Sequence, residues 1–423
     1  MNNVILSNKS LVAGVIIASI LLITRDILMI DVGDVVLLGV FTAIMIILPF
    51  PSLVSFVFFL IPLTCGIPGY MMLVAFALLI IKGRGWNIKQ MTPLVLVFVL
   101  EMINELGRTP DTTGVISFLS FVAVFFFLLN LNNKNVDPGQ NILLFVVGVT
   151  ITFGVIYYNM LNQYGIEGIL TGMFRSGALG VVDNDIDVMK GHLAANANTI
   201  AYYAICATST AIVSLPYLHY KKWIMISLAS ICFLGGILTF SRTFILCIAL
   251  LLFLYFIFQG QSSSGKYMFL GTLAILTMVI ILLGDYVLDI TDVFSSRAEA
   301  DDFATGGGRT VIFKLYNKLW SSDIWYIMFG CGAVGYFDLL KAPNAIHCGM
   351  QQIWVCLGVI GFLLFVYEFI SYFKRFIGRN NLILLIPFIV SFFFDQSVQF
   401  LRPYYMLPPI LSTFMVCQLH NLK

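Results

Sequence analysis

Long uninterrupted apolar runs constrain this chain of 423 residues more than any other feature of its sequence. They recur from Leu11 to Val416, and most come close to the roughly 17 to 25 residues that an α-helix needs to cross a bilayer. Only 10% of the residues are charged and 60% are hydrophobic, whereas about 25% of an ordinary soluble domain is charged. The sequence excludes a soluble globule and predicts a helical membrane protein.

The apolar windows predict an all-α polytopic membrane protein of about 12 to 14 transmembrane helices, with the whole chain, 1–423, as one integral-membrane domain. Fourteen windows are present, and twelve is the alternative if the short early ones around Pro49, Pro51, Pro62 and Pro68 merge or are re-entrant. The windows lie at 11–24, 35–49, 52–66, 69–82, 91–106, 112–131, 141–161, 198–218, 222–240, 243–258, 266–288, 350–373, 381–394 and 403–418.

The distribution of Lys and Arg predicts the orientation of these windows. With the N-terminus inside, the inside segments hold twelve of the 23 basic residues and one acid, Asp137. The other eleven basic residues are spread over longer outer segments that carry nearly all the acids. This asymmetry places both termini in the cytoplasm. The window at 11–24 lacks a small-residue cleavage site after it and is interpreted as an uncleaved first span.

Two outer segments, 162–197 and 289–348, are long enough to carry a functional site, and the second contains helix-forming and Gly-rich parts. The inside segments are too short to build a nucleotide-sugar site, so a donor must already be outside. Six of the eight cysteines fall within or at the ends of windows. Cys331 and Cys348 lie in the second outer segment, where the sequence leaves a disulfide between them undecided. No metal-binding spacing of Cys and His is present.

Two arginines are candidates for binding an anion on the outer side. Arg242 follows Ser241 at the junction of two windows, where it either snorkels to the lipid headgroups or forms a forked pair with a lipid phosphate. Arg309 follows three glycines and opens 309–320, which resembles an amphipathic helix lying on the membrane with its N-terminus available for an anion. The alternative for that segment is a flexible turn before an ordinary loop helix.

His347 lies just before the window at 350–373, where an imidazole could accept a proton from a hydroxyl. His192, in the first outer segment, is the weaker candidate. Glu101 should face a polar interior, either to orient a base, to act as a base itself, or to pair with an arginine. The acidic run 183–187 is interpreted as a solvated turn, with a cation site as the alternative.

These features together resemble the bacterial O-antigen polymerase and O-antigen ligase superfamily. The resemblance covers about 198–373, and the first half of the chain matches only in its apolar windows. One departure is Cys348, which follows His347 where the family commonly has Asn. The matching residues are Asn198-Thr199 with Ala201, Ser241-Arg242-Thr243, Gly308-Arg309, Phe329 to Gly332 with Gly335, and then His347, Gln352, Gly358 and Gly361.

The resemblance implies a GT-C-like glycosyltransferase of the bacterial inner membrane, with its active site on the periplasmic face. Its donor would be a glycan on undecaprenyl diphosphate, and it would need no metal or other cofactor. A hydroxyl of a second lipid-linked repeat unit would attack the anomeric carbon directly, which inverts that centre. The resemblance implies His347 as the general base, Arg242 and Arg309 as diphosphate ligands, Arg175 and Arg402 as further outer ligands, and Glu101 and Gln352 as supporting polar residues.

Three other functions stay open at this point. An O-antigen ligase, which moves the glycan to lipid A-core, and a capsule-type polymerase use the same chemistry as the favoured O-antigen polymerase. A lipid-linked oligosaccharide flippase is the rival from a different class, but the two halves of the chain show no internal repeat of the transporter kind. The expected partners are lipid-linked glycans, membrane lipids and a protein that regulates chain length, with no nucleic acid.

Overall fold

The computed structural model describes the chain in several stretches, and every structural statement below concerns them. They are residues 9–68, 70–83, 86, 92–105, 115, 119, 123, 136–170, 192–215, 222–259, 309–333, 336–340, 346 and 348–373. The elements within them are helical. The predicted windows at 112–131, 266–288, 381–394 and 403–418 lie largely or wholly outside the described residues.

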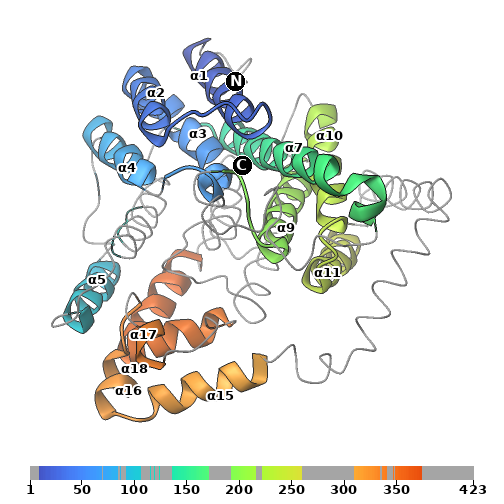
Figure 1. Ribbon diagram of the computed structural model, residues 1–423. Coiled ribbons are helices and arrows are strands. Elements are labelled where there is room, and N and C mark those ends of the chain that lie inside the picture. Colours follow the sequence, from blue (N-terminus) through green and yellow to red (C-terminus); the bar gives the residue numbers. More distant parts are fainter. Residues whose placement is uncertain are drawn as a thin grey trace.

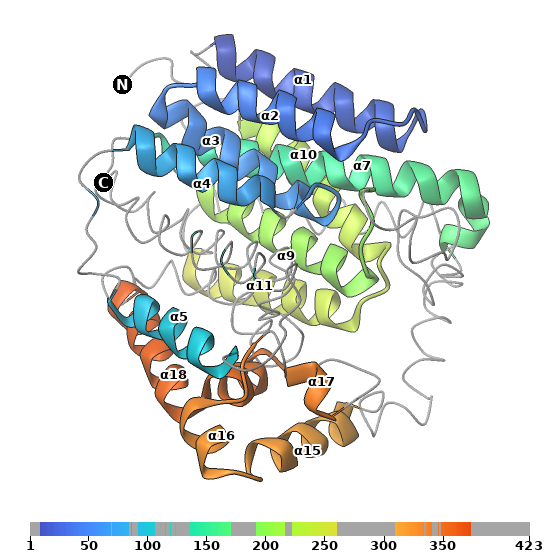
Figure 2. The same ribbon diagram turned by 60° about the vertical axis from the view of Figure 1, so that its left-hand side comes forward.

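The helices pack in two groups (Figures 1 and 2). In the α7 group, α7 lies against α1, α3, η1, α9 and α10, with α4 beside α3, with α2 beside α1 and α4, and with α11 beside α9. Its members are α1 (Lys9–Asp26), α2 (Asp34–Ile47), α3 (Phe50–Leu60), η1 (Ile61–Cys65), α4 (Tyr70–Lys82), α7 (Pro138–Leu170), α9 (Ala197–Ser214), α10 (Lys222–Ile237) and α11 (Arg242–Gln259).

The second group, here the α18 group, surrounds α18 (Gly349–Phe373), the helix that follows residues 289–348. Helix α18 packs against α5, α15 and α16, and a ring contact between Tyr316 and Tyr336, with centroids 5.6 Å apart, joins α15 to α17. The members are α5 (Thr92–Glu105), α15 (Arg309–Trp320), α16 (Ile324–Phe329), α17 (Tyr336–Leu340) and α18 (Gly349–Phe373). Segments more than 200 residues apart in the chain, such as α5 and α18, thus lie side by side (Figure 2).

The predicted fold class, a GT-C-like protein of 12 to 14 transmembrane helices, is wrong. Among the described residues, only Pro138–Leu170 and Gly349–Tyr367 are long and apolar enough to cross a membrane. In both of these segments more than half of the most apolar stretch is buried against the rest of the protein, as in the core helices of soluble proteins. Two such helices are weak grounds for a membrane span, and they do not make a polytopic bundle.

The prediction failed because it measured apolar runs and not helix lengths. Proline at 49 and 51 separates α2 from α3, so α2 has 14 residues and α3 has 11. At 1.5 Å per residue these helices are about 21 Å and 17 Å long, against the roughly 30 Å of a bilayer core. Helix α1 is longer, but it carries Lys9, Arg25 and Asp26 and ends in a buried ion pair.

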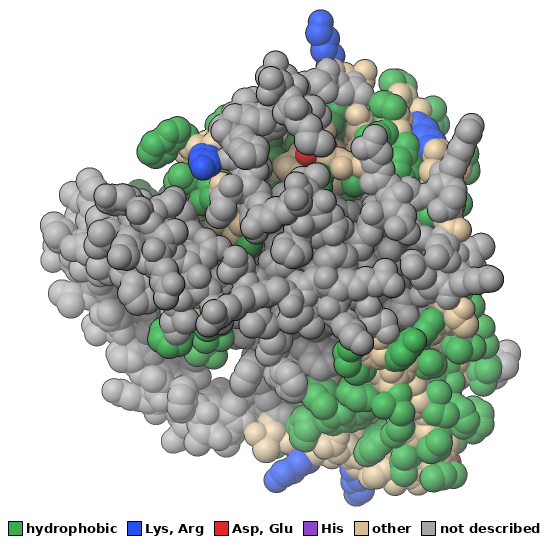
Figure 3. Space-filling view, turned by 180° about the vertical axis from the view of Figure 1, so that it is seen from behind, with side chains coloured by type: hydrophobic (Ala, Val, Ile, Leu, Met, Phe, Trp, Pro, Cys, Tyr) green, Lys and Arg blue, Asp and Glu red, His purple; other side chains and the backbone are tan. Residues whose placement is uncertain are grey.

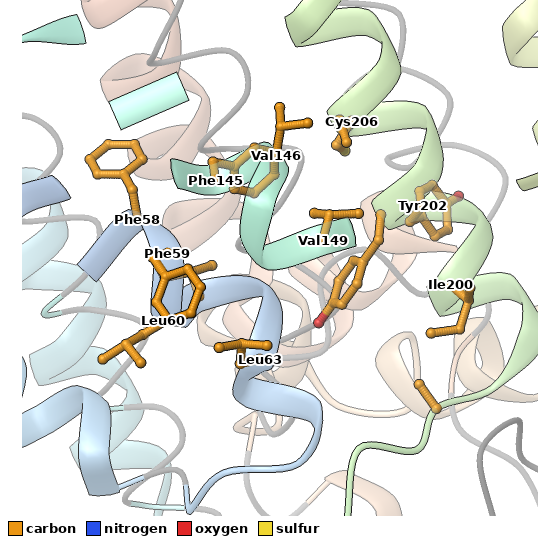
Figure 4. Packing of buried hydrophobic residues seen from close by; sticks show 14 of the residues in the cluster. Phe58, Phe59, Leu60, Leu63, Phe145, Val146, Val149, Ile200, Tyr202 and Cys206 are labelled. Atoms are coloured by element: carbon orange, nitrogen blue, oxygen red, sulfur yellow. The ribbon is translucent and has the colours of Figure 1, made fainter. Parts of the chain in front are cut away.

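The core of the α7 group is built where α3, η1, α7 and α9 meet. Figure 4 shows Phe59 and Leu63 facing Val149 of α7, with Ile200 and Tyr202 of α9 on the other side. A buried polar contact joins the same elements, because the Ser55 hydroxyl lies 2.7 Å from Oδ1 of Asn141. Large apolar side chains supply the hydrophobic driving force for this packing, and the buried hydroxyl and amide fix its register.

Candidate functional site

A turn at residues 330–333, here the 330–333 turn, lies against a break in α18. Gly358 has a φ of 65° and interrupts the helix, and Gly330 has a φ of 80° and ends α16. Each glycine lies so close to the other segment that a Cβ on either one would overlap the facing backbone. The positive φ and the close approach both require glycine at these positions. The Gly-rich patch of the sequence is therefore a backbone-to-backbone contact.

The break in α18 frees carbonyl groups that the 330–333 turn then occupies. The N–H of Cys331 donates to the carbonyl of Val355 at 2.9 Å. The N–H of Gly332 donates to the carbonyl of Cys356, also at 2.9 Å. Cys331 and Cys348 do not form a disulfide in the structure, and the Cys331 thiol lies 3.0 Å from the Val355 carbonyl.

Polar side chains of α5 hold the same turn from the opposite side. The carboxylate of Glu101, which is fully buried, accepts from the N–H of Ala333 at 2.7 and 2.8 Å. The Asn104 amide donates to the Phe329 carbonyl at 2.8 Å and accepts from the Trp325 indole at 3.2 Å. The sequence left Glu101 with three interpretations, orienting a base, acting as a base itself, or pairing with an arginine. Its carboxylate positions a backbone turn, a contact that the sequence did not predict, and the described contacts do not test those interpretations.

Helix α15, which begins at Arg309, is fastened to the first turn of α18. The side-chain N–H₂ of Gln351 donates to the Phe313 carbonyl at 2.7 Å and to the Asn317 side chain at 3.0 Å. The rings of Phe313 and Trp354 also pack edge to face, with centroids 6.1 Å apart. The backbone of Arg309 is therefore held near the start of α18, while its side chain lies outside the description.

Gln352, one of the predicted supporting residues, is only 1% exposed, yet its side-chain nitrogen and oxygen have no hydrogen-bond partner. Its backbone N–H donates to the Cys348 carbonyl at 2.9 Å, which places it in the first turn of α18. An unsatisfied buried amide costs about 1–3 kcal/mol. The Gln352 side chain therefore has a hydrogen-bond donor and an acceptor available in the first turn of α18.

Arg242 begins α11, next to the first turn of α9. The hydroxyl of the preceding Ser241 lies 3.5 Å from Oδ1 of Asn198. These two residues, which are 43 positions apart, both belong to the motifs that carry the resemblance, and they meet here. Phe240, with a φ of 51°, makes the sharp turn between α10 and α11. The position of the Arg242 backbone is thereby set, although its side chain lies outside the description.

Several predicted residues lie outside the described part of the chain. They are His347, Arg175, Arg402 and the acidic run 183–187. Among the residues that are described, no group of three or more His, Cys, Asp and Glu side chains could hold a metal ion.

A cluster of Arg25, Asp26 and His192, in which the Arg25–Asp26 pair is buried, was not predicted from the sequence. Arg25 and Asp26 end the first apolar run, and His192 precedes α9. The signal available was the adjacent pair of opposite charges directly after an apolar run, since buried charges need partners. The partner, His192, is 166 positions away in the chain, so sequence spacing alone does not point to it.

The comparisons with known proteins add no relative. No known family matches this chain, and no curated protein matches it significantly.

Proposed function

We propose that the protein is a membrane glycosyltransferase that moves a glycan from undecaprenyl diphosphate to a hydroxyl of a lipid-linked repeat unit, as an O-antigen polymerase does. The contact between Ser241 and Asn198 carries this proposal. It brings together two separate marks of the resemblance at the adjoining ends of α9 and α11. The backbone of Arg242, the predicted diphosphate ligand, lies at the same place.

The surface of the described helices supports a location in the membrane. Large apolar side chains gather over the α18 group, as Figure 3 shows at its lower right. A soluble protein rarely exposes a contiguous apolar patch of this kind, whereas contact with lipid removes it from water. The most exposed include Val95, Leu96 and Val99 on α5, Ile324, Trp325 and Met328 on α16, and Leu363, Tyr367 and Ile370 on α18.

The α18 group supports the same function through Arg309 and Gln352. The two residues lie at the beginnings of α15 and α18, and Gln351 joins these two helices. In a transfer from a diphosphate carrier, negative charge grows on the departing diphosphate. Guanidinium groups of Arg309 and Arg242 can stabilise that charge, because each presents a fork of N–H donors. Arg175 and Arg402 are further ligands in this proposal.

The experiment is chain extension by the purified protein. In detergent, the wild-type protein should lengthen a lipid-linked repeat unit and release undecaprenyl diphosphate, with no nucleotide sugar added. Arg242→Gln should lower the rate by at least about 100-fold, a loss typical of a missing donor at a developing anion. Arg242→Lys should restore only part of it, since lysine keeps the charge and loses the fork.

Lys222→Gln is the matched control, because Lys222 is exposed at the start of α10 and lies in a predicted inside segment. It should extend chains at the wild-type rate. A wild-type protein that moves lipid-linked glycan across a bilayer and never lengthens it would contradict the proposal in favour of a flippase. In cells, deletion of a polymerase should leave single repeat units on the core, whereas deletion of a ligase would leave bare core.

A further inference from the structure

The Arg25, Asp26 and His192 cluster joins two segments, the end of α1 and the residues just before α9. Nε and Nη2 of Arg25 each lie 2.8 Å from a different oxygen of the Asp26 carboxylate, which makes a bidentate pair. Nδ1 of His192 lies 2.8 Å from Oδ1 of the same carboxylate. Arg25 is 4% exposed and Asp26 is 1% exposed. One buried carboxylate therefore holds both a guanidinium and an imidazole.

The carboxylate determines where the proton of a neutral His192 lies. An ionised carboxylate can only accept hydrogen bonds, so Nδ1 must carry the proton that points at Asp26. In the neutral imidazole, Nε2 then has a free lone pair. Nε2 makes no hydrogen bond to any described residue, and the His192 side chain is 35% exposed. This arrangement of a carboxylate and a histidine is the one that orients a general base in hydrolases.

Backbone contacts hold the cluster in place. The side-chain N–H₂ of Asn159, on α7, donates to the Asp26 carbonyl at 2.9 Å. Gly66 lies against the backbone of the next segment, where a Cβ would come within 2.6 Å of Leu193 and 2.8 Å of His192. The imidazole is therefore positioned by α1, α7 and the residue after η1 at once.

One guanidinium nitrogen of Arg25 is left over. Its Nη1 is buried and has no hydrogen-bond partner. The remaining guanidinium nitrogens are both used by Asp26. On one carboxylate the cluster thus combines a proton acceptor, Nε2 of His192, with a cationic guanidinium.

The cluster is also near in the sequence to a residue on which the proposed function depends. His192 is six positions before Asn198, so an extended chain separates their Cα atoms by at most about 20 Å. Asn198 in turn contacts Ser241, the neighbour of Arg242. The positive-inside pattern places 162–197 on the outer side, the side on which a lipid-linked donor would be found.

We propose that His192 is the general base of the glycosyl transfer, oriented by Asp26, and that the acceptor sugar hydroxyl binds at its Nε2. This inference rests on the proposed function. Nε2 takes the hydroxyl proton while the hydroxyl oxygen forms a bond to the anomeric carbon of the donor. The bond from that carbon to the diphosphate oxygen breaks, and its electron pair leaves with the diphosphate. The new imidazolium is stabilised by Asp26.

Arg25 acts beside His192 as a positioning residue, because it fixes both oxygens of the Asp26 carboxylate. The family resemblance implies a different base, His347, and the two assignments predict opposite results when each histidine is replaced alone.

The experiment measures chain extension by the full-length protein carrying His192→Gln, His347→Gln or Lys318→Gln. Lys318, exposed on α15 in the α18 group, provides the control. Loss of a general base lowers the rate about 10²- to 10⁴-fold, so His192→Gln should lose at least 100-fold in kcat with KM changed less than threefold. Lys318→Gln should stay within threefold of wild type, whereas His347→Gln, which tests the rival assignment, should lose less of the rate than His192→Gln. Equal thermal unfolding temperatures would show that His192→Gln is folded.

A second measurement does not depend on activity. In protein labelled with ¹⁵N-histidine, the signal that disappears in His192→Gln should have the shifts of an imidazole protonated on Nδ1. A signal from the Nε2-protonated form would overturn the assignment. A His192→Gln protein that extends chains within threefold of the wild-type rate would also overturn the assignment of His192 as the base. In that case the proposed function would still stand. A wild-type protein without any transfer activity would overturn the proposed function, and the role of His192 with it.

Discussion

Gly66 shows at the scale of a single residue how a close backbone contact positions His192, the candidate base. It has an ordinary φ of −137°, so alanine is excluded there only by the neighbouring backbone of Leu193 and His192. The constraint on this glycine is thus the approach of another segment and not backbone strain. Gly39 on α2 has nothing within 4 Å of its would-be Cβ and offers a matched comparison.

We expect Gly66→Ala to destabilise the protein by about 1–3 kcal/mol, because an added methyl must push the two backbones apart. It should also lower chain extension by displacing His192. Gly39→Ala should leave both properties near wild type, or stabilise slightly, since alanine favours the helix. Thermal unfolding and the extension assay measure these effects. Equal stability of the two variants would show that Gly66 is not closely packed.

Glu101 provides a second test at the residue scale. Glu101→Ala should lower the free energy of unfolding by about 1–3 kcal/mol, because the N–H of Ala333 is left buried without its acceptor. Glu101→Gln should lose less, since the amide oxygen can still accept one hydrogen bond. Denaturant unfolding of the two variants gives the difference. A Glu101→Gln variant that is as unstable as Glu101→Ala would mean that the charge, and not the hydrogen bond, matters.

Within its group, helix α7 packs against more of the other elements than any other helix does. Asp137 caps its N-terminus. The Asp137 carboxylate accepts from the N–H groups of Gly139 and Gln140 at 2.9 and 3.2 Å, and Pro138 occupies the first helical position. This is the pattern of a strong helix start. Burial nevertheless raises the pKa of Asp137 above its ordinary value of 3.8, and the two hydrogen bonds only partly oppose the rise.

The raised pKa makes the contribution of Asp137 depend on pH. Because the folded state holds this proton more tightly than the unfolded state does, the contribution falls as pH rises from 3.8 through the raised pKa. We expect Asp137→Asn to keep the cap and to flatten this part of the stability curve. Asp137→Ala should lose the cap and about 1 kcal/mol. Unfolding measured from pH 3 to 7, at about one-unit steps, tests both variants. An unchanged curve for Asp137→Asn would contradict the expectation.

Helix α18 shows why an apolar run does not specify its own helix geometry. The window at 350–373 predicted one span, and the helix does cover Gly349–Phe373. The break at Gly358 depends on the 330–333 turn, whose N–H groups occupy the freed carbonyls. Because buried backbone groups need hydrogen-bond partners, the break in α18 depends on the N–H groups of the 330–333 turn.

At the scale of the whole molecule, the proposed location predicts which side of the membrane each end of the α7 group faces. Leu28, just after the Arg25 and Asp26 pair, is 61% exposed. In cells, Leu28→Cys should react with a membrane-impermeant maleimide added from outside. Lys222→Cys should react only after the membrane is permeabilised. Labelling above that of the parent protein is the measurement, since the parent contains eight cysteines. The reverse pattern would contradict the proposed orientation.

The positions of many helices could be predicted from the sequence. The windows at 35–49, 69–82, 91–106 and 222–240 agree within a few residues with α2, α4, α5 and α10, because apolar runs and the Pro, Gly and charged residues that end them act locally. The same pattern overestimated the number of membrane spans. It counted short windows such as 35–49 and 69–82 as spans, and it could not tell burial in protein from burial in lipid.

The sequence by itself determined the local properties: all-helical segments, where they begin and end, and a short set of polar residues worth inspecting, including Glu101 and Gln352. Only the tertiary structure decided which of these groups meet. It paired Glu101 with Ala333, 232 positions away, and Asp26 with His192, 166 positions away. Such pairs form because packing the apolar faces brings distant segments together, and a buried charge must then find a partner among whatever lies beside it.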